Sequence, residues 1–304
     1  AKSFHCASVR SLGYIASSSS FVMTASSSFY TKFLKQLLKP IPHDIEIVAY
    51  AYDEKGNKAI TIPIGKMIVR ANDEKHRKTM KIALTRVFTN VTQDNKTEEG
   101  VFTSNELVSL FNTLHQSLIL PEVVNTVRRK GVDEDIILNL ENDKKFLNGT
   151  PGAGYGEYLS AGVINPDDGK GFAAYLETRL DRIYPECKLS RDYFLAFCFW
   201  ENGLTDLLGR ASAKVAAGKL VFRSSVSIFP ARDDPTLPHE LLHALQLFHT
   251  HKGASISARL QMAQRYIFPL ASTTNVMSYN PDSCYSLWKW QWDIMQENAE
   301  RIIR

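Results

Sequence analysis

The sequence predicts an α+β fold, in which a small antiparallel β module precedes a larger domain of mixed sheet and packed helices. Two patterns indicate this fold. Between Asp44 and Phe88, short stretches in which apolar residues recur with period two are separated by polar turns, as in strands that pair as hairpins. Beyond residue 100, apolar residues recur at spacings of three and four, as on helices, and strand patterns lie between them. A chain of 304 residues is long enough to bury both cores.

The N-terminal part divides into two predicted segments. Residues 1–40 are rich in serine and then basic and apolar, a composition that favours a linker ending in a short helix. Residues 41–95 form the predicted antiparallel β module, in which the polar turn Glu54 to Asn57 separates the first two strands. The polar stretch from Asn90 to Gly100 has little to bury, so we place the domain boundary there.

Residues 100–304 form the predicted larger domain, in which helical and strand patterns alternate. The helical patterns begin at Ser104, at Gly171 (to Ile183) and at Arg191 (to Leu208). The strand patterns are Asp135 to Leu140 and Lys219 to Phe229. Glycines at alternate positions between Gly149 and Gly156 predict a plain loop, because a phosphate-binding loop would end in Gly-Lys-Ser/Thr.

Charge, hydropathy and cysteine spacing exclude several classes of protein. The net charge is only +4 and the basic residues are scattered among acids, so we expect no nucleic-acid partner. The longest apolar run, Tyr193 to Trp200, falls far short of the about 20 residues that a membrane-spanning helix needs, so we expect no span. No C-x-x-C pair occurs, and Cys187 and Cys198 are either buried thiols or a disulfide.

The chemistry of the chain is concentrated in His239-Glu240-Leu241-Leu242-His243. On a helix, residues four apart share a face, so both imidazoles can reach one metal ion. Neutral imidazole is a good ligand for Zn²⁺, and a catalytic zinc site uses three protein ligands and one open position. We therefore predict that His239 and His243 bind Zn²⁺ and that Glu240 is the general base that takes a proton from water.

A third ligand is required, and we predict that it is His249. No glutamate occurs between Leu241 and Gln296 to take that place. On an unbroken helix, however, His249 would be rotated about 240° from His243, away from the ligand face. We therefore expect the chain to turn near Gln246. If it turns later, His251 is the alternative ligand.

These residues resemble the metzincin metallopeptidases, whose pattern is H-E-x-x-H-x-x-G-x-x-H followed by a methionine turn. Asn275-Val276-Met277-Ser278-Tyr279 is similar to that turn, and Gln246 stands where the family has glycine. The resemblance covers roughly Phe102 to Arg304. It implies a peptide or protein substrate, Met277 beneath the metal, and an edge strand at Lys219 to Phe229 that holds the substrate. Tyr279 would bind the oxyanion, cap the metal or simply pack.

A looser resemblance concerns the biological setting. The segments Gly65 to Asp73 and Leu114 to Ile119, together with the zinc motif, resemble effectors of the bacterial type VI secretion system that carry a C-terminal metzincin-like domain. This implies a toxin delivered into a competing bacterium, with the periplasm as one compartment of action, and a secretion-spike partner and an immunity protein. Two alternatives stay open: a non-toxic secreted or housekeeping zinc peptidase, and a spike module with a degenerate site.

Overall fold

The structure is a computed structural model and describes residues 7–11, 40–51, 62–89, 98–141, 143, 146, 158–160, 162–166, 171–251, 267–279 and 284–304. The short helix predicted before residue 40 and the glycine loop Gly149 to Gly156 lie outside these residues. The chain divides into two compact units, Ala1–Arg77 and Lys78–Arg304.

The first unit contains a three-stranded antiparallel sheet. Its strands, in the order β1-β2-β3, are β1 (Ala7–Ser11), β2 (Ile45–Ala51) and β3 (Ile62–Val69), and a short 3-10 helix, η1 (Glu74–His76), follows them. The hairpin of β2 and β3 agrees with the alternating pattern. The prediction of a linker is wrong for β1, because five residues are too few to show a period and backbone pairing with β2 forms the strand.

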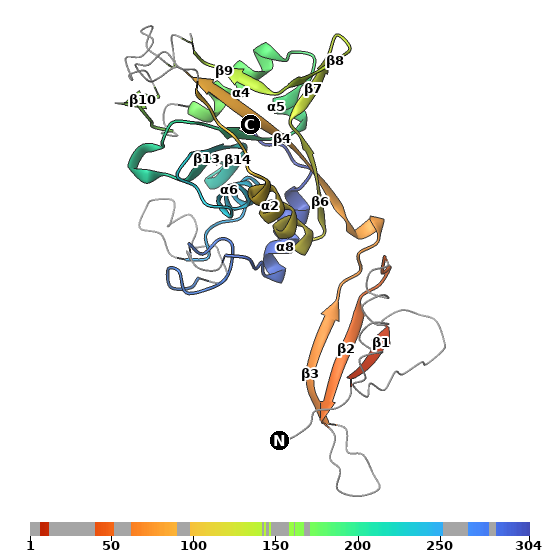
Figure 1. Cartoon of the computed structure of the whole chain (residues 1–304). Coiled ribbons are helices and arrows are strands. Elements are labelled where there is room, and N and C mark those ends of the chain that lie inside the picture. The colour runs from red at the N-terminus through yellow and green to blue at the C-terminus, as the bar shows by residue number, and fades with distance from the viewer. Residues whose placement is uncertain are drawn as a thin grey trace, which may run out of the picture. The chain divides into compact units, whose positions relative to one another are not determined.

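The second unit is built around a seven-stranded sheet with β4 (Lys78–Thr89) at its centre (Figure 1). Along the order β13-β14-β12-β4-β5, the neighbours of β12 are parallel to it, whereas the terminal pairs are antiparallel. β6 and β9 also pair with β4, in parallel. These strands are β5 (Glu98–Glu99), β6 (Ile119–Val124), β9 (Ile137–Asn139), β12 (Phe194–Cys198), β13 (Gly209–Ala216) and β14 (Lys219–Ile228). Two small hairpins join β7 (Thr126–Arg129) to β8 (Val132–Asp135) and β10 (Leu159–Ser160) to β11 (Val163–Ile164).

The position of β4 moves the domain boundary from the predicted Asn90 to Gly100 to the junction of Arg77 and Lys78. The predicted β module, residues 41–95, therefore loses its last strand to the larger unit. Alternation along β4 suggested a half-exposed strand. Its intervening residues, Ala83 and Val87, are also completely buried, so both faces need a covering layer.

Helices cover both faces of this sheet. One core cluster joins β4, β12 and β14 to α2 (Ser104–Gln116), α6 (Thr236–Ala244) and α8 (Lys289–Asn298). A second cluster, on the other face, contains residues of α4 (Phe172–Ile183) and α5 (Leu189–Asp192). α2 and α4 lie where helical spacing predicted helices. None of the described helices has the length and apolarity needed to cross a membrane.

The predicted helix Arg191 to Leu208 is wrong. This segment forms β12 and then a short 3-10 helix, η3 (Leu204–Asp206). Every residue of β12 is buried, and parallel neighbours flank it on both sides. A continuous aromatic run has no period, so only the sheet decides that it is a strand. Cys187 and Cys198 are both free thiols, and Cys198 is buried in β12.

The prediction that Lys219 to Phe229 is the edge strand is also wrong. Lys219 to Phe229 does form a strand, β14, but β14 pairs with β13 on one side and with β12 on the other. β13 ends the strand order of the described sheet. The sequence shows strands one after another along the chain, whereas the edge is fixed by which of two hairpin partners meets the central strands.

The start of α2 is fastened to the chain that enters α6. Thr103, the residue before the Ser104 at which the helical pattern begins, caps α2, and its amide donates to the Glu106 carboxylate at 2.7 Å. The same carboxylate forms an ion pair with Arg232; Glu106 is buried, and 9% of the Arg232 side chain is exposed. Arg232 also donates to the carbonyl of Phe229 at 3.3 Å. A largely desolvated charge pair of this kind fixes the loop that leads into α6.

Candidate metal centre

Helix α6 carries two histidines in a completely buried setting. All nine of its residues are buried, and Leu237, Leu241 and Leu242 pack in the cluster shared with α2 and β14. Desolvation lowers the pKa of His239 to about 4 and lowers that of His243 well below its usual value, because burial disfavours the charged ring. Both imidazoles are therefore neutral at pH 7, the form that binds metal.

The chain turns at Gln246, as expected from the position of His249, which an unbroken helix would carry away from the ligand face. The backbone of Gln246 is left-handed, with φ at 69°. Its amide donates to the carbonyl of His243 at 2.7 Å, and the amide of Leu247 donates to that of Leu242 at 3.0 Å. These are the two bonds of a Schellman turn, which ends a helix and reverses the chain. The reversal brings His249 back to the face of α6 that carries the other two histidines.

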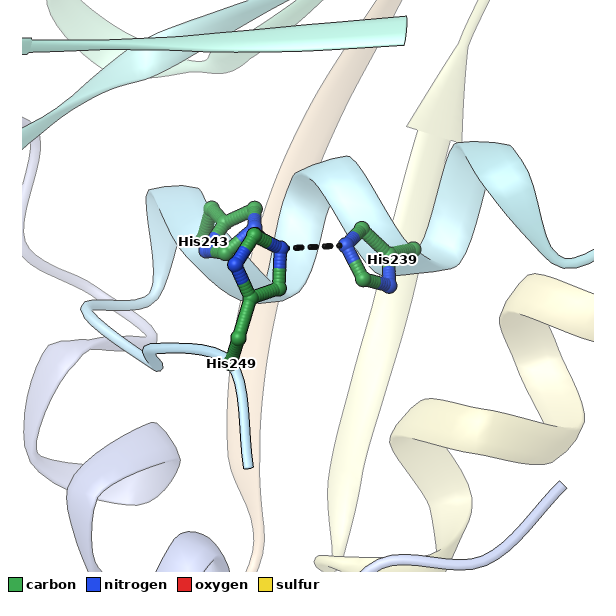
Figure 2. A group of neighbouring side chains, drawn as sticks. All are labelled: His239, His243 and His249. Carbon is green, nitrogen blue, oxygen red and sulfur yellow. Dashed lines mark hydrogen bonds between the residues drawn. The ribbon is translucent and has the colours of Figure 1, made fainter. Parts of the chain in front are cut away.

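The three histidines converge through their Nε2 atoms (Figure 2). Nε2 of His249 lies 3.1 Å from Nε2 of His239 and 2.9 Å from Nε2 of His243. In His239, Nδ1 lies 2.7 Å from the carbonyl oxygen of Val276, and in His243 it lies 2.7 Å from that of Leu247. A carbonyl oxygen only accepts, so Nδ1 carries the proton in both rings. Each Nε2 then has a free lone pair directed at the common point.

This set of donors fits a zinc ion. Among the described residues, His239, His243 and His249 form a group whose ligand atoms all lie within 4.8 Å of one another. Tetrahedral Zn²⁺ with bonds of about 2.0–2.1 Å would hold its ligand nitrogens about 3.3 Å apart, close to the separations above. Facing lone pairs repel without a cation between them, and the two carbonyls supply the supporting contacts typical of metal-bound histidine.

His251, the alternative ligand, occupies a different position. Its ring stacks on that of His249, with centroids 4.9 Å apart and planes inclined by 20°. It is not part of the convergent group. The turn at Gln246 therefore selects His249 and leaves His251 packed behind it.

The side chain of Glu240 extends from α6 toward Gly209, at the start of β13. A Cβ atom at Gly209 would be 2.6 Å from Cγ of Glu240, so only glycine permits this close approach. Desolvation raises the pKa of the Glu240 carboxyl to about 7, although a hydrogen bond from the amide of Ala211 opposes the shift. A carboxyl group that titrates near pH 7 can both accept and release a proton under physiological conditions.

Glu240 and His239 both line a cavity of about 380 Å³. Apolar and small residues form most of its other walls, and they come from the loop before β13, the start of α6 and the segment after residue 275. Leu207, Leu208, Pro235, Thr236 and Val276 are among them. The cavity is therefore directly accessible from the side chains of His239 and Glu240.

The predicted methionine turn is present as a turn over Asn275–Ser278, closed by a 2.9 Å bond from the amide of Ser278 to the carbonyl of Asn275. Met277 is completely buried in the cluster that contains Leu241. Its carbonyl accepts from the amide of Thr250 at 3.0 Å. The turn thus holds the segment that carries His249, and through the carbonyl of Val276 it also orients His239.

Tyr279 lies directly after this turn, with a left-handed backbone at φ 46°. The centroid of its ring is 4.5 Å from that of His249 and 5.3 Å from that of His239. It lines the cavity, and 54% of its surface stays exposed. The ring therefore lies beside the metal ligands at the solvent boundary, where the predicted roles as oxyanion donor or metal cap stay predictions.

Sequence reasoning missed the amide pair that fixes the turn. Asn275 and Gln291 are both completely buried. The Asn275 amide donates to Oε1 of Gln291 at 2.7 Å, and the Gln291 amide donates back at 3.1 Å. Oδ1 of Asn275 also accepts from the amide of Met277 at 3.0 Å. No local pattern links positions so far apart in sequence, and a buried amide pair becomes visible only when α8 packs against the turn.

No family model matches the chain, and no curated protein matches it.

The raised pKa of Glu240 predicts how the stability of the metal-free protein depends on pH. The folded carboxyl has a pKa of about 7 against an ordinary value of 4.5, so between these values the folded state binds more protons than the unfolded state. Glu240 therefore destabilises the fold increasingly as pH rises through this window. Relative to wild type, we expect Glu240→Gln to gain up to about 3 kcal/mol of unfolding free energy between pH 5 and pH 8.

Urea denaturation of both metal-free proteins at these two pH values measures this difference. The titration of His239 and His243 is common to both proteins and cancels. A stability difference that is the same at both pH values would contradict the assigned burial of the carboxyl.

Proposed function

We propose that the second unit is a zinc-dependent peptidase. The observation that carries the proposal is the convergence of three Nε2 atoms next to a buried carboxyl group that lines an open cavity. A set of metal ligands, a base that titrates near neutrality and a space for substrate are the components needed for metal-assisted hydrolysis.

His239, His243 and His249 would hold the ion and leave a fourth position open. When bound, zinc supplies Lewis acidity, which lowers the pKa of water and polarises a carbonyl group. Glu240 takes the proton from the attacking water and then delivers it to the nitrogen of the departing amine, which its pKa near 7 permits in both directions. Tyr279, beside His239 and His249, donates a hydrogen bond to the oxyanion.

β13 is the element best placed to bind an extended substrate. It ends the order of the described sheet, and its first residue, Gly209, touches Glu240. A peptide that pairs with the outer edge of β13 would run past the base with its backbone held by hydrogen bonds. Because such pairing uses the substrate backbone, the proposal includes a broad range of peptide sequences.

The proposal extends to the metzincin family and to a type VI secretion effector that acts as a toxin in a target bacterium. The spacing of His239, His243 and His249, the buried Met277 and the turn at Gln246 support the family assignment. The delivery route, a spike partner, an immunity protein and action in the periplasm rest on the resemblance of Gly65 to Asp73 and Leu114 to Ile119 alone.

Removal and return of the metal tests the peptidase directly. We expect chelated protein to leave an unfolded substrate such as casein intact and one equivalent of Zn²⁺ to restore its cleavage. Expression with and without a periplasmic signal tests the toxin proposal separately, with growth as the measurement. Protein that binds one equivalent of zinc and cleaves neither casein nor a peptide library would contradict the peptidase.

A further inference from the structure

Gln246 has a backbone conformation that glycine would adopt more readily, and its side chain makes contacts that glycine lacks. A left-handed backbone is unfavourable for a residue with a Cβ atom, so glutamine at φ 69° needs compensating contacts. The structure provides them through the side-chain amide. Oε1 of Gln246 accepts from the amide of Phe222 at 3.0 Å, and Nε2 donates to the carbonyl of Phe222 at 2.9 Å.

These two bonds let the side chain act as a neighbouring strand residue. A strand residue satisfies the donor and the acceptor of its partner with its own backbone groups. Phe222 lies in β14 ahead of the stretch that pairs with β12, which begins at Ser225. The amide of Gln246 serves both backbone groups of Phe222 there, and Nε2 also donates to the carbonyl of Ala244 at 3.1 Å. The turn is thereby attached to β14 and to the last residue of α6.

The attachment reaches the metal ligands by two routes. The buried ring of Phe222 stacks on His243, with centroids 4.7 Å apart and planes inclined by 29°. The turn also places the carbonyl of Leu247, which accepts from Nδ1 of His243 at 2.7 Å. Beyond the turn the chain continues to His249. One side chain therefore restrains the ring of one ligand and the backbone that carries another.

We propose that Gln246 is a positioning residue of the metal centre, which holds His243 and His249 in their binding arrangement before the ion arrives. The inference rests on the proposed metal site and deepens it. Contacts that orient ligands in this way commonly change metal affinity by about 10–100-fold. Glycine would ease the backbone of the turn and lose all three bonds of the amide.

The test compares wild type with Gln246→Gly and Gln246→Glu. Glycine keeps the turn and removes the amide, whereas glutamate keeps the length and replaces the donor that faces the Phe222 carbonyl. Ala217→Gly is the matched control, because Ala217 is also left-handed, at φ 50°, and lies in the exposed turn between β13 and β14. The measurements are the zinc Kd by competition with a coloured chelator, the rate of zinc release to excess chelator, and the visible spectrum of the Co²⁺ form.

We expect both Gln246 variants to bind zinc about 10–100-fold more weakly, to release it faster and to alter the Co²⁺ spectrum, with Ala217→Gly unchanged. A purely structural role would lower the melting temperature of the metal-free variants and leave the zinc Kd of the folded protein at the wild-type value. That result would overturn the inference. Should glycine prevent folding, the Gln246→Glu variant decides between the same two outcomes. Wild-type protein that binds no zinc would instead contradict the metal centre itself.

Discussion

Replacement of Glu240 by glutamine is expected to slow peptide cleavage by roughly 10²–10⁴-fold while the protein keeps its zinc. Glutamine has nearly the same shape as glutamate, so it preserves the contact with Gly209 that packs α6 against β13. It has no proton-accepting carboxylate, and proton transfer from the attacking water is lost. The three histidines and their supporting carbonyls, from Val276 and Leu247, are unchanged.

Initial rates on a fluorogenic peptide and zinc content by mass spectrometry measure the two halves of this expectation. Glu297→Gln is the matched control, since Glu297 is exposed on α8. Variant and wild type with equal cleavage rates would remove Glu240 from the mechanism. Loss of zinc together with activity would show that Glu240 supports the metal site rather than the chemistry.

The second large effect concerns the third ligand. We expect His249→Ala to lose its zinc almost completely. The zinc affinity should fall by more than the factor of about 10–100 that the loss of a supporting contact costs. Its Nε2 faces the Nε2 atoms of both His239 and His243, at 3.1 and 2.9 Å, and no described side chain nearby completes the group in its place. His251→Ala should keep stoichiometric zinc, because His251 stacks on His249 from outside the group.

Equilibrium dialysis against buffered zinc distinguishes the two variants. His115→Ala, at an exposed position on α2, controls for the loss of an ordinary histidine. The melting curves of the metal-free proteins show that each variant folds. Zinc retained by His249→Ala and lost by His251→Ala would reverse the assignment and place the ligand two residues later.

The candidate site was largely predictable because its ligands are close in sequence. His239 and His243 share a helix face at a spacing of four, and helical geometry alone brings them together. The predicted turn near Gln246 followed from the same geometry, because His249 cannot return to that face on a continuous helix. What the turn requires of the glutamine side chain was not predictable, since Phe222 lies on another strand.

The fold was predictable where an element buries only one face, because its apolar residues then recur with a regular period. Helical spacing located α2 and α4, and alternation located β2, β3 and β4. The same reasoning failed where burial is complete. β12 lacks a period because it is covered on both faces, and β4 was assigned to the wrong unit because alternation does not name its partners.

The sequence by itself determined that His239, His243 and His249 converge with Glu240 next to them on α6, because local helix and turn geometry fixes the directions of neighbouring side chains. Tertiary structure alone decided which strand forms the edge beside Glu240, which carbonyls orient His239 and His243, and that Asn275 meets Gln291. These contacts join residues far apart along the chain. The packing of whole elements decides which residues meet, and local sequence patterns do not show it.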